Sequence, residues 1–116
     1  MQGEANPFAG VWTGGWFADS KAVGSWTMRV APDGSVTGTA SDNRTMQTAT
    51  LAGTVMPDGA YNYVYHYGLR ERSGRGTVQL IGSDAATCAW RDYEDGLVVS
   101  MGVSQLKRQP EIAPES

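Results

Sequence analysis

The chain has 116 residues, of which 12 are acidic and nine are basic, so its formal net charge is −3. A chain of this length fits one domain with a single hydrophobic core. The acidic balance argues against a nucleic-acid partner. A single cysteine excludes an intrachain disulfide, and no paired Cys and His ligand sets of the kind that structural zinc needs are present. We expect no transmembrane helix, because no run of about 18 apolar residues exists.

The two ends of the chain differ in composition from its middle. The first seven residues are polar and contain no hydrophobic stretch, so we expect no signal peptide in the chain as given, while a leader removed earlier leaves export open. Residues 107–116 include Pro110 and Pro114 among mostly polar neighbours, which predicts a flexible tail. We therefore expect an N-terminal segment over residues 1–8, one domain over 9–106 and the tail.

Glycine accounts for 15 residues, about twice its usual share, and has no regular period, so we interpret the glycines as turns and bends. Turn clusters recur at hairpin spacing between stretches in which apolar and polar residues alternate. They are Pro32-Asp33-Gly34, Pro57-Asp58-Gly59, Gly82-Ser83-Asp84 and Glu94-Asp95-Gly96. Proline presets the φ of the second turn position and glycine accepts a positive φ, so the Pro-Asp-Gly segments predict tight turns.

Eight strands and no helix are predicted around these turns. In the second, Trp26, Met28 and Val30 share one face, which is typical of a strand buried on one side. The predicted strands are Gly10–Phe17, Ser25–Val30, Ser35–Ala40, Met46–Val55, Ala60–Tyr67, Thr77–Ile81, Thr87–Asp92 and Leu97–Leu106. Closing such a sheet removes its two unpaired edges. The predicted fold is all-β, a small antiparallel up-and-down barrel of about eight strands, with a two-sheet β-sandwich as the alternative.

The first predicted strand contains Gly10-Val11-Trp12 and then Gly14-Gly15-Trp16. A Gly-x-Trp on the first strand of an eight-stranded barrel resembles the calycin group, which includes lipocalins, avidins and small bacterial metalloprotease inhibitors. The resemblance implies that Trp12 plugs the barrel floor beneath a cation from the end of the last strand. Lys107 and Arg108 both follow Leu106 there, and Arg108 is our candidate. A cation over an indole ring contributes about 0.5–2 kcal/mol.

Two further segments, Gly14–Phe17 and Asp33–Thr39, are similar to the first hairpins of avidins. The chain departs from that family at Ala18 and Ala40, where avidins place a polar biotin ligand and a tyrosine. Its final strands also lack the family's tryptophan lid and terminal aspartate. The resemblance therefore implies no biotin site.

The fifth predicted strand places its tyrosines on one face. Tyrosine offers a rigid apolar body and a polar tip, which suits contacts with a flat or lipid-like ligand. The alternative is a ladder that packs inside the barrel, and the sequence leaves open which face is interior. Our candidate ligand contacts are Tyr61, Tyr63, Tyr65, Tyr67 and Trp26.

A basic cluster of Arg70, Arg72 and Arg75 falls in what we predict to be the longest loop. Guanidinium groups on a glycine-containing loop suit a phosphate or carboxylate, so we consider an anion-binding loop, with a solvated loop as the alternative. His66, the only histidine, is accompanied by no nucleophile motif, and we interpret it as an ordinary strand residue. Cys88 shares a face with Trp90 and Asp92, which favours a buried thiol.

No set of residues suits acid-base or nucleophilic catalysis, so we expect no catalytic residues, metal or cofactor. Aromatic density without catalytic groups indicates a non-enzymatic domain that binds a small apolar or aromatic ligand in a calycin-like barrel. The alternative is a protein-interaction barrel, either an inhibitor or a homo-oligomer, that buries its aromatic face against a partner. Residues 1–8 would be the inserting arm of a metalloprotease inhibitor, but that family carries a disulfide that Cys88 alone cannot form.

Overall fold

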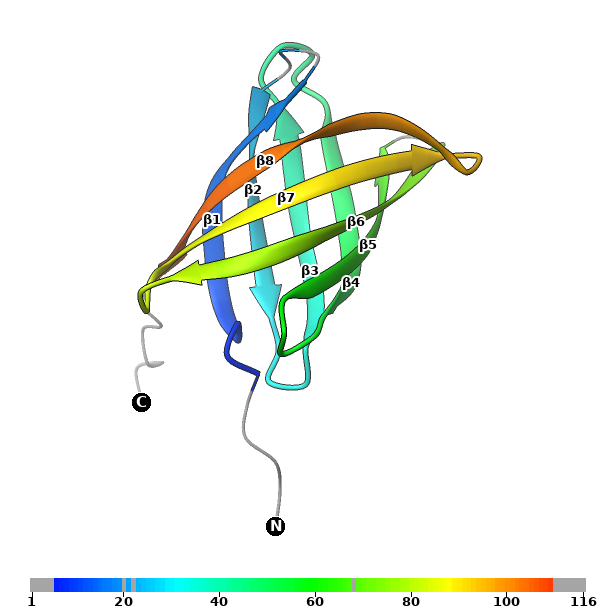
Figure 1. Ribbon diagram of the computed structural model, residues 1–116. Helices are drawn as coiled ribbons and strands as arrows, with labels where there is room; N and C mark the ends of the chain where they lie inside the picture. Colours follow the sequence, from blue (N-terminus) through cyan, green and yellow to red (C-terminus); the bar gives the residue numbers. More distant parts are fainter. Residues whose placement is uncertain (1–5, 20, 22, 68, 110–116) are drawn as a thin grey trace, which may run out of the picture.

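The computed structural model describes residues 6–19, 21, 23–67 and 69–109. Antiparallel strands follow one another in chain order and the last pairs with the first, so the sheet closes into a barrel (Figure 1). The strands are β1 (Gly10–Ala18), β2 (Val23–Val30), β3 (Ser35–Asp42), β4 (Thr48–Val55), β5 (Ala60–Tyr67), β6 (Arg70–Ile81), β7 (Ala85–Glu94) and β8 (Leu97–Gln109). The predicted all-β up-and-down barrel is confirmed, and the β-sandwich alternative is wrong.

Each predicted strand corresponds to one strand of the barrel. Both Pro-Asp-Gly segments form turns, with φ values of +95° at Gly34 and +99° at Gly59. The main difference is the stretch 70–76, which belongs to β6 rather than to a loop. The sequence pattern does not reveal this part of the strand, because its inward positions hold Arg72, Gly74 and Gly76 instead of the apolar side chains that mark a buried face. β8 likewise continues beyond Leu106 to Gln109, while residues 110–116 lie outside the described residues.

Several strand glycines provide space for aromatic rings and are not turns or bends. Gly74 pairs with Tyr63, and a Cβ at Gly74 would lie 2.1 Å from Cζ of that tyrosine. Gly24 pairs with Trp16, and a Cβ there would lie 2.5 Å from the indole carbon Cε2. Both distances are shorter than any van der Waals contact, so each ring occupies the space of the missing side chain. The turn interpretation is therefore wrong for these glycines, which lie inside strands.

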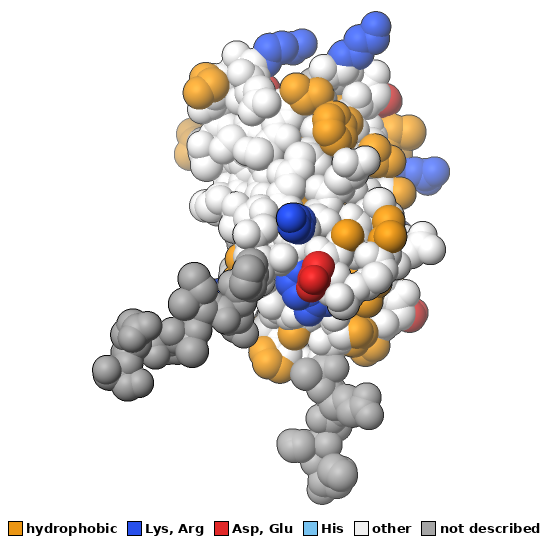
Figure 2. All heavy atoms as spheres, turned by 90° about the vertical axis from the view of Figure 1, so that its left-hand side faces the viewer, with side chains coloured by type: hydrophobic (Ala, Val, Ile, Leu, Met, Phe, Trp, Pro, Cys, Tyr) orange, Lys and Arg blue, Asp and Glu red, His pale blue; other side chains and the backbone are white. Residues whose placement is uncertain are grey.

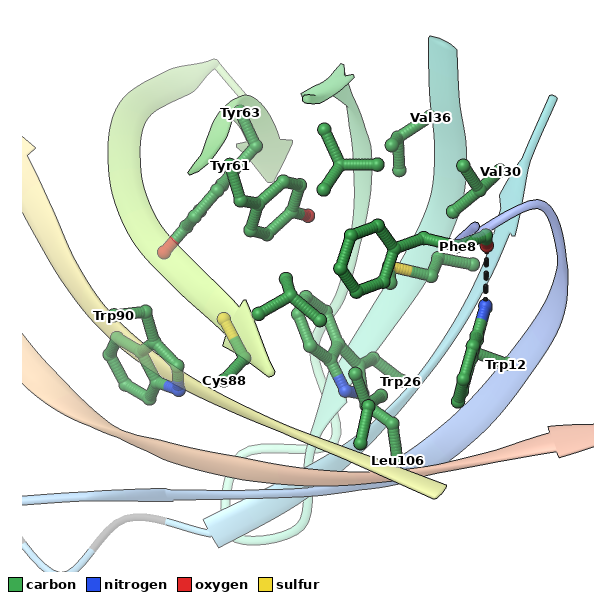
Figure 3. Packing of buried hydrophobic residues seen from close by; sticks show 14 of the residues in the cluster. Phe8, Trp12, Trp26, Val30, Val36, Tyr61, Tyr63, Cys88, Trp90 and Leu106 are labelled. Carbon is green, nitrogen blue, oxygen red and sulfur yellow. Dashed lines mark hydrogen bonds between the residues drawn. The ribbon is translucent and has the colours of Figure 1, made fainter. Parts of the chain in front are cut away.

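One end of the barrel is closed by the residues that precede β1. The Asn6 side chain donates from Nδ2 to the carbonyl of Val55 at 2.9 Å and accepts from the Phe8 amide at 2.9 Å. This turn directs the Phe8 ring into the core, where Figure 3 shows it near Val30 and Trp12. Because these backbone groups are hydrogen-bonded within the protein, the floor can be buried without leaving them unpaired.

Trp12 and Arg108 meet at this floor. Trp12 is 1% exposed and its Nε1 donates to the Phe8 carbonyl at 2.8 Å (Figure 3). The Cζ of Arg108 lies 4.5 Å from the centroid of the Trp12 ring. The same guanidinium donates to the carbonyls of Ala9 at 2.6 Å and Pro7 at 3.0 Å, so it ties β8 to the segment that covers the floor.

The tyrosine face of β5 is interior. Tyr61 and Tyr63 are buried and their ring centroids lie 4.8 Å apart, and Tyr65 continues the stack at 6.1 Å from Tyr63. Trp26 approaches Tyr61 from β2 at 6.2 Å. Figure 3 shows the rings of Tyr61 and Trp26 pointing into the interior of the barrel.

We expect Arg108→Ala to lower the free energy of unfolding by about 1–3 kcal/mol, because it removes a cation over an indole ring and two charge-assisted hydrogen bonds. Urea unfolding followed by tryptophan fluorescence measures the change. Lys107→Ala is the matched control, since Lys107 is the exposed neighbouring cation on β8. Equal effects of the two substitutions would contradict the role given to Arg108.

Candidate functional site: an aromatic cavity at the open end

The end of the barrel opposite the Trp12 floor contains a cavity of about 270 Å³. Its apolar walls are formed mainly by Trp16, Trp26, Leu51 and Trp90, and its polar groups include Tyr63, Tyr65, Arg72 and Asp92. Three alanines, Ala18, Ala40 and Ala49, also line it. Small side chains at these positions leave the open end of the barrel unfilled, whereas larger side chains fill the end near the Trp12 floor.

A buried carboxylate forms the polar centre of the wall. Asp92 is 7% exposed. Its Oδ1 accepts a short hydrogen bond from the Tyr63 hydroxyl, and its Oδ2 accepts one from the Tyr65 hydroxyl at 2.8 Å. Gly74 lies between Tyr63 and Asp92 in the cross-strand row, so the ring passes over β6 to reach β7. The ladder between β7 and β8 shifts register directly after Asp92, an irregularity that often re-aims side chains beside functional sites.

The buried environment shifts the pKa values of Asp92 and of the two tyrosines that donate to it. Burial raises the pKa of Asp92 above its usual value, while the hydrogen bonds from Tyr63 and Tyr65 and the charge of Arg72 oppose that shift. Burial, followed by the charge of Asp92, raises the pKa of both tyrosines. The tyrosines therefore stay protonated and act as donors to the carboxylate.

The indole N–H groups of two walls are bonded within the protein. Trp16 Nε1 donates to the carbonyl of Ser41 at 3.1 Å, and Trp90 Nε1 donates to Ser104 Oγ at 2.9 Å. The Trp16 and Trp90 rings meet edge to face, with centroids 6.4 Å apart. These contacts fix the orientation of both walls.

Arginines of β6 divide between the two faces of the strand. Arg72 Nε donates to Glu94 at 2.9 Å, and Arg70 Nη2 binds the same carboxylate at 2.9 and 3.1 Å. These bonds lower the pKa of Glu94. Arg75 is exposed on the opposite face, with its Cζ 5.5 Å from the Tyr93 ring centroid. The prediction of a loop is wrong, because the stretch belongs to β6. Arg70 and Arg72 meet at Glu94 and Arg75 lies on the other face, so anion binding by all three together stays a prediction.

The candidate ligand contacts have different positions. Trp26, Tyr63 and Tyr65 line the cavity, whereas Tyr61 is 1% exposed and lies in the core. The side chain of Tyr67 lies outside the described residues. Three further lining residues, Trp16, Trp90 and Asp92, were not among the predicted site residues. The available signal was the alternation of β7, which places Trp90 and Asp92 on one face.

Other reactive side chains lie away from the cavity. His66 is exposed, with Nε2 at 2.8 Å from Glu71 Oε2. Cys88 is 1% exposed, and burial raises its pKa to about 12. Within the described ranges, no three or more His, Cys, Asp and Glu side chains are grouped so that they could hold a metal ion. No helix in the described part of the chain is long and apolar enough to cross a membrane.

The chain has no match among protein-family models, and no curated protein matches it in sequence. The barrel and its cavity are therefore the basis for a functional proposal.

We expect Gly74→Ala to lower the free energy of unfolding by about 2–4 kcal/mol, because the new Cβ displaces the Tyr63 ring and breaks its buried bond to Asp92. Thermal unfolding followed by near-ultraviolet circular dichroism reports both the stability and the tyrosine environment. Ser73→Ala, at the exposed neighbouring position, should change neither. A Gly74→Ala protein with wild-type stability would show that the ring does not need this space.

Proposed function

We propose that the protein is a non-enzymatic binding domain that holds one small, mainly aromatic ligand in the open end of a calycin-like barrel. The single observation that carries the proposal is the cavity of about 270 Å³ with three tryptophan walls, Trp16, Trp26 and Trp90. Rings at a cavity wall offer large apolar contact areas, while the few polar groups beside them orient a ligand.

Size and preorganisation both support a small ligand. The volume lies just below the range of about 300–1,000 Å³ that is typical of ligand pockets, which suits a molecule of one or two rings. The Trp16 and Trp90 indoles are already fixed by hydrogen bonds to Ser41 and Ser104. Binding against walls that are ordered beforehand costs little side-chain entropy.

A binding role rather than a catalytic one is supported by the positions of the reactive groups. The Asp92 carboxylate is engaged by two tyrosine hydroxyls, and the thiol of Cys88 is buried and protonated. His66 faces the outside of β5, away from the cavity. Acid-base chemistry requires such groups within hydrogen-bond reach of one substrate.

The closed floor supports the calycin-like assignment. Arg108 at the end of β8 covers Trp12 on β1, as the resemblance to that group implies. A closed floor and an open aromatic end give the barrel one entrance for a ligand.

A cavity-filling substitution tests this proposal. We expect 1-aminonaphthalene, a two-ring probe that is neutral at neutral pH, to bind the wild-type protein with a saturable rise in its fluorescence. Ala49→Leu places a larger side chain in the cavity wall and should weaken binding at least about tenfold. Ala52→Leu, on the exposed face of the same strand, is the control and should bind like the wild type. Unchanged binding by Ala49→Leu would place the probe elsewhere, and no binding by the wild type would contradict the proposal.

A second candidate function is self-association through the outer face of the barrel. The tyrosine face proposed for a partner is interior, so that form of the alternative is wrong. Val23, Phe17 and Val103 instead form an exposed apolar row across β2, β1 and β8. Figure 2, which views the left-hand side of Figure 1, shows separate hydrophobic side chains over this face, with basic and acidic side chains near its centre. An uncharged row offers a partner no charge to complement, so a second copy of the chain is its best match.

We expect, if this second function holds, that sedimentation equilibrium gives a dimer mass and that Val103→Lys restores the monomer by placing a charge in the row. Thr87→Lys is the control, since it adds the same charge on β7 outside the row. A monomeric wild-type protein at high concentration would exclude this function.

A further inference from the structure

Asp92 is the one charged side chain in the buried class among the described residues. A carboxylate removed from water to this degree is costly unless it is paired with a cation or fully hydrogen-bonded. Its two observed partners, Tyr63 and Tyr65, are neutral hydroxyls. No salt bridge to Asp92 is found in the described part of the chain, and the nearby Arg72 forms its ion pair with Glu94. The charge of Arg72 acts on Asp92, but no described cation contacts the carboxylate directly.

The carboxylate oxygens of Asp92 can accept further hydrogen bonds at this wall. Tyr63 and Tyr65 each direct a proton to Asp92, one to each carboxylate oxygen. A carboxylate has about four lone-pair sites, so each oxygen can accept one further bond. The indole protons of Trp16 and Trp90 are bound to protein oxygens, and the Nε1 of Trp26, which has no hydrogen-bond partner among the described residues, is itself buried. The free lone pairs of Asp92 therefore match a ligand group that donates hydrogen bonds.

The remaining charges and the walls favour the same ligand class. The lining contains two acids, Asp42 and Asp92, against one base, Arg72, which is bound to Glu94. An anionic ligand would therefore meet like charges that are partly desolvated. Indole rings attract a cation placed over their faces within about 6 Å of the centroid. An organic cation gains from both the carboxylate and the aromatic walls.

We propose that the ligand is a small arylalkylamine in its protonated form, with the ammonium group bound to Asp92 and the ring held between the tryptophan walls. This inference rests on the proposed binding function and adds the chemical class of the ligand. The cavity volume of about 270 Å³ suits a single ring on a short alkyl chain.

Three phenyl compounds of similar size and different charge test the proposal: phenethylamine, 2-phenylethanol and 3-phenylpropionate. Their affinities are measured by isothermal titration calorimetry at neutral pH on the full chain. We expect phenethylamine to bind at least about tenfold more tightly than the neutral alcohol, and the carboxylate to bind most weakly. Asp92→Asn should remove this preference, while Asp84→Asn, the same change of charge at an exposed position near the closed end, should retain it.

The outcomes separate this inference from the binding function. Equal affinities for the three compounds, or a preference for the alcohol or the carboxylate, overturn the amine assignment and leave the binding function in place. If none of the compounds binds and 1-aminonaphthalene does not bind either, the binding function fails and the inference fails with it. If Asp92→Asn does not fold, the wild-type order of affinities decides alone, because it depends on ligand charge and not on a variant.

Discussion

The structure depends on one steric constraint: an eight-stranded barrel has an interior of fixed width, and a large ring that lies flat across the adjacent strand needs a position without a side chain there. Tyr63 meets this requirement at Gly74, and Trp16 meets it at Gly24. The glycines let the rings lie flat across the adjacent strands instead of competing for the barrel axis. Tyr63 can therefore reach Asp92, which lies two strands away.

The same constraint explains why the barrel has a closed end and a hollow end. Near the floor, inward positions hold Trp12, Met28 and Val36, which together with Phe8 exclude water. At the other end, alanines occupy inward positions on β1, β3 and β4. The Trp16 ring beside them is fixed by its hydrogen bond to the Ser41 carbonyl. The cavity is thus a consequence of side-chain sizes along strands of regular geometry, and it needs no distortion of the sheet apart from the register shift after Asp92.

Local patterns predicted the fold well because turns and alternation are local. Pro-Asp-Gly determines a tight turn within a few residues, and Trp26, Met28 and Val30 identify the buried face of β2 without knowledge of its neighbours. The start of β6 was predicted as a loop because Gly74 provides space for the Tyr63 ring of another strand, and a single sequence does not show which ring covers which glycine. The position of Asp92 in the cavity wall was not predicted, for a related reason.

The pairing of Asp92 with Tyr63 requires the register across β5, β6 and β7, which only the closed sheet defines. The candidate residues Trp26, Tyr63 and Tyr65 were identified because their strands alternate clearly, whereas Asp92 stands just before the predicted acidic turn Glu94-Asp95-Gly96. A carboxylate near a turn is normally solvated, and its burial here follows from the length of β7, which continues past it to Glu94.

The pairing of β1 with β8 links the two ends of the molecule. This one ladder places Arg108 beside Trp12 at the floor and Ser104 beside Trp16 at the cavity. Ser104 in turn accepts the indole proton of Trp90, so the ladder that closes the barrel also positions two walls of the site. Because the register of a closed sheet shifts as a whole, an error at the floor would misplace the walls as well. The floor contacts thus act on the site through the strand register, without any direct contact between the two ends.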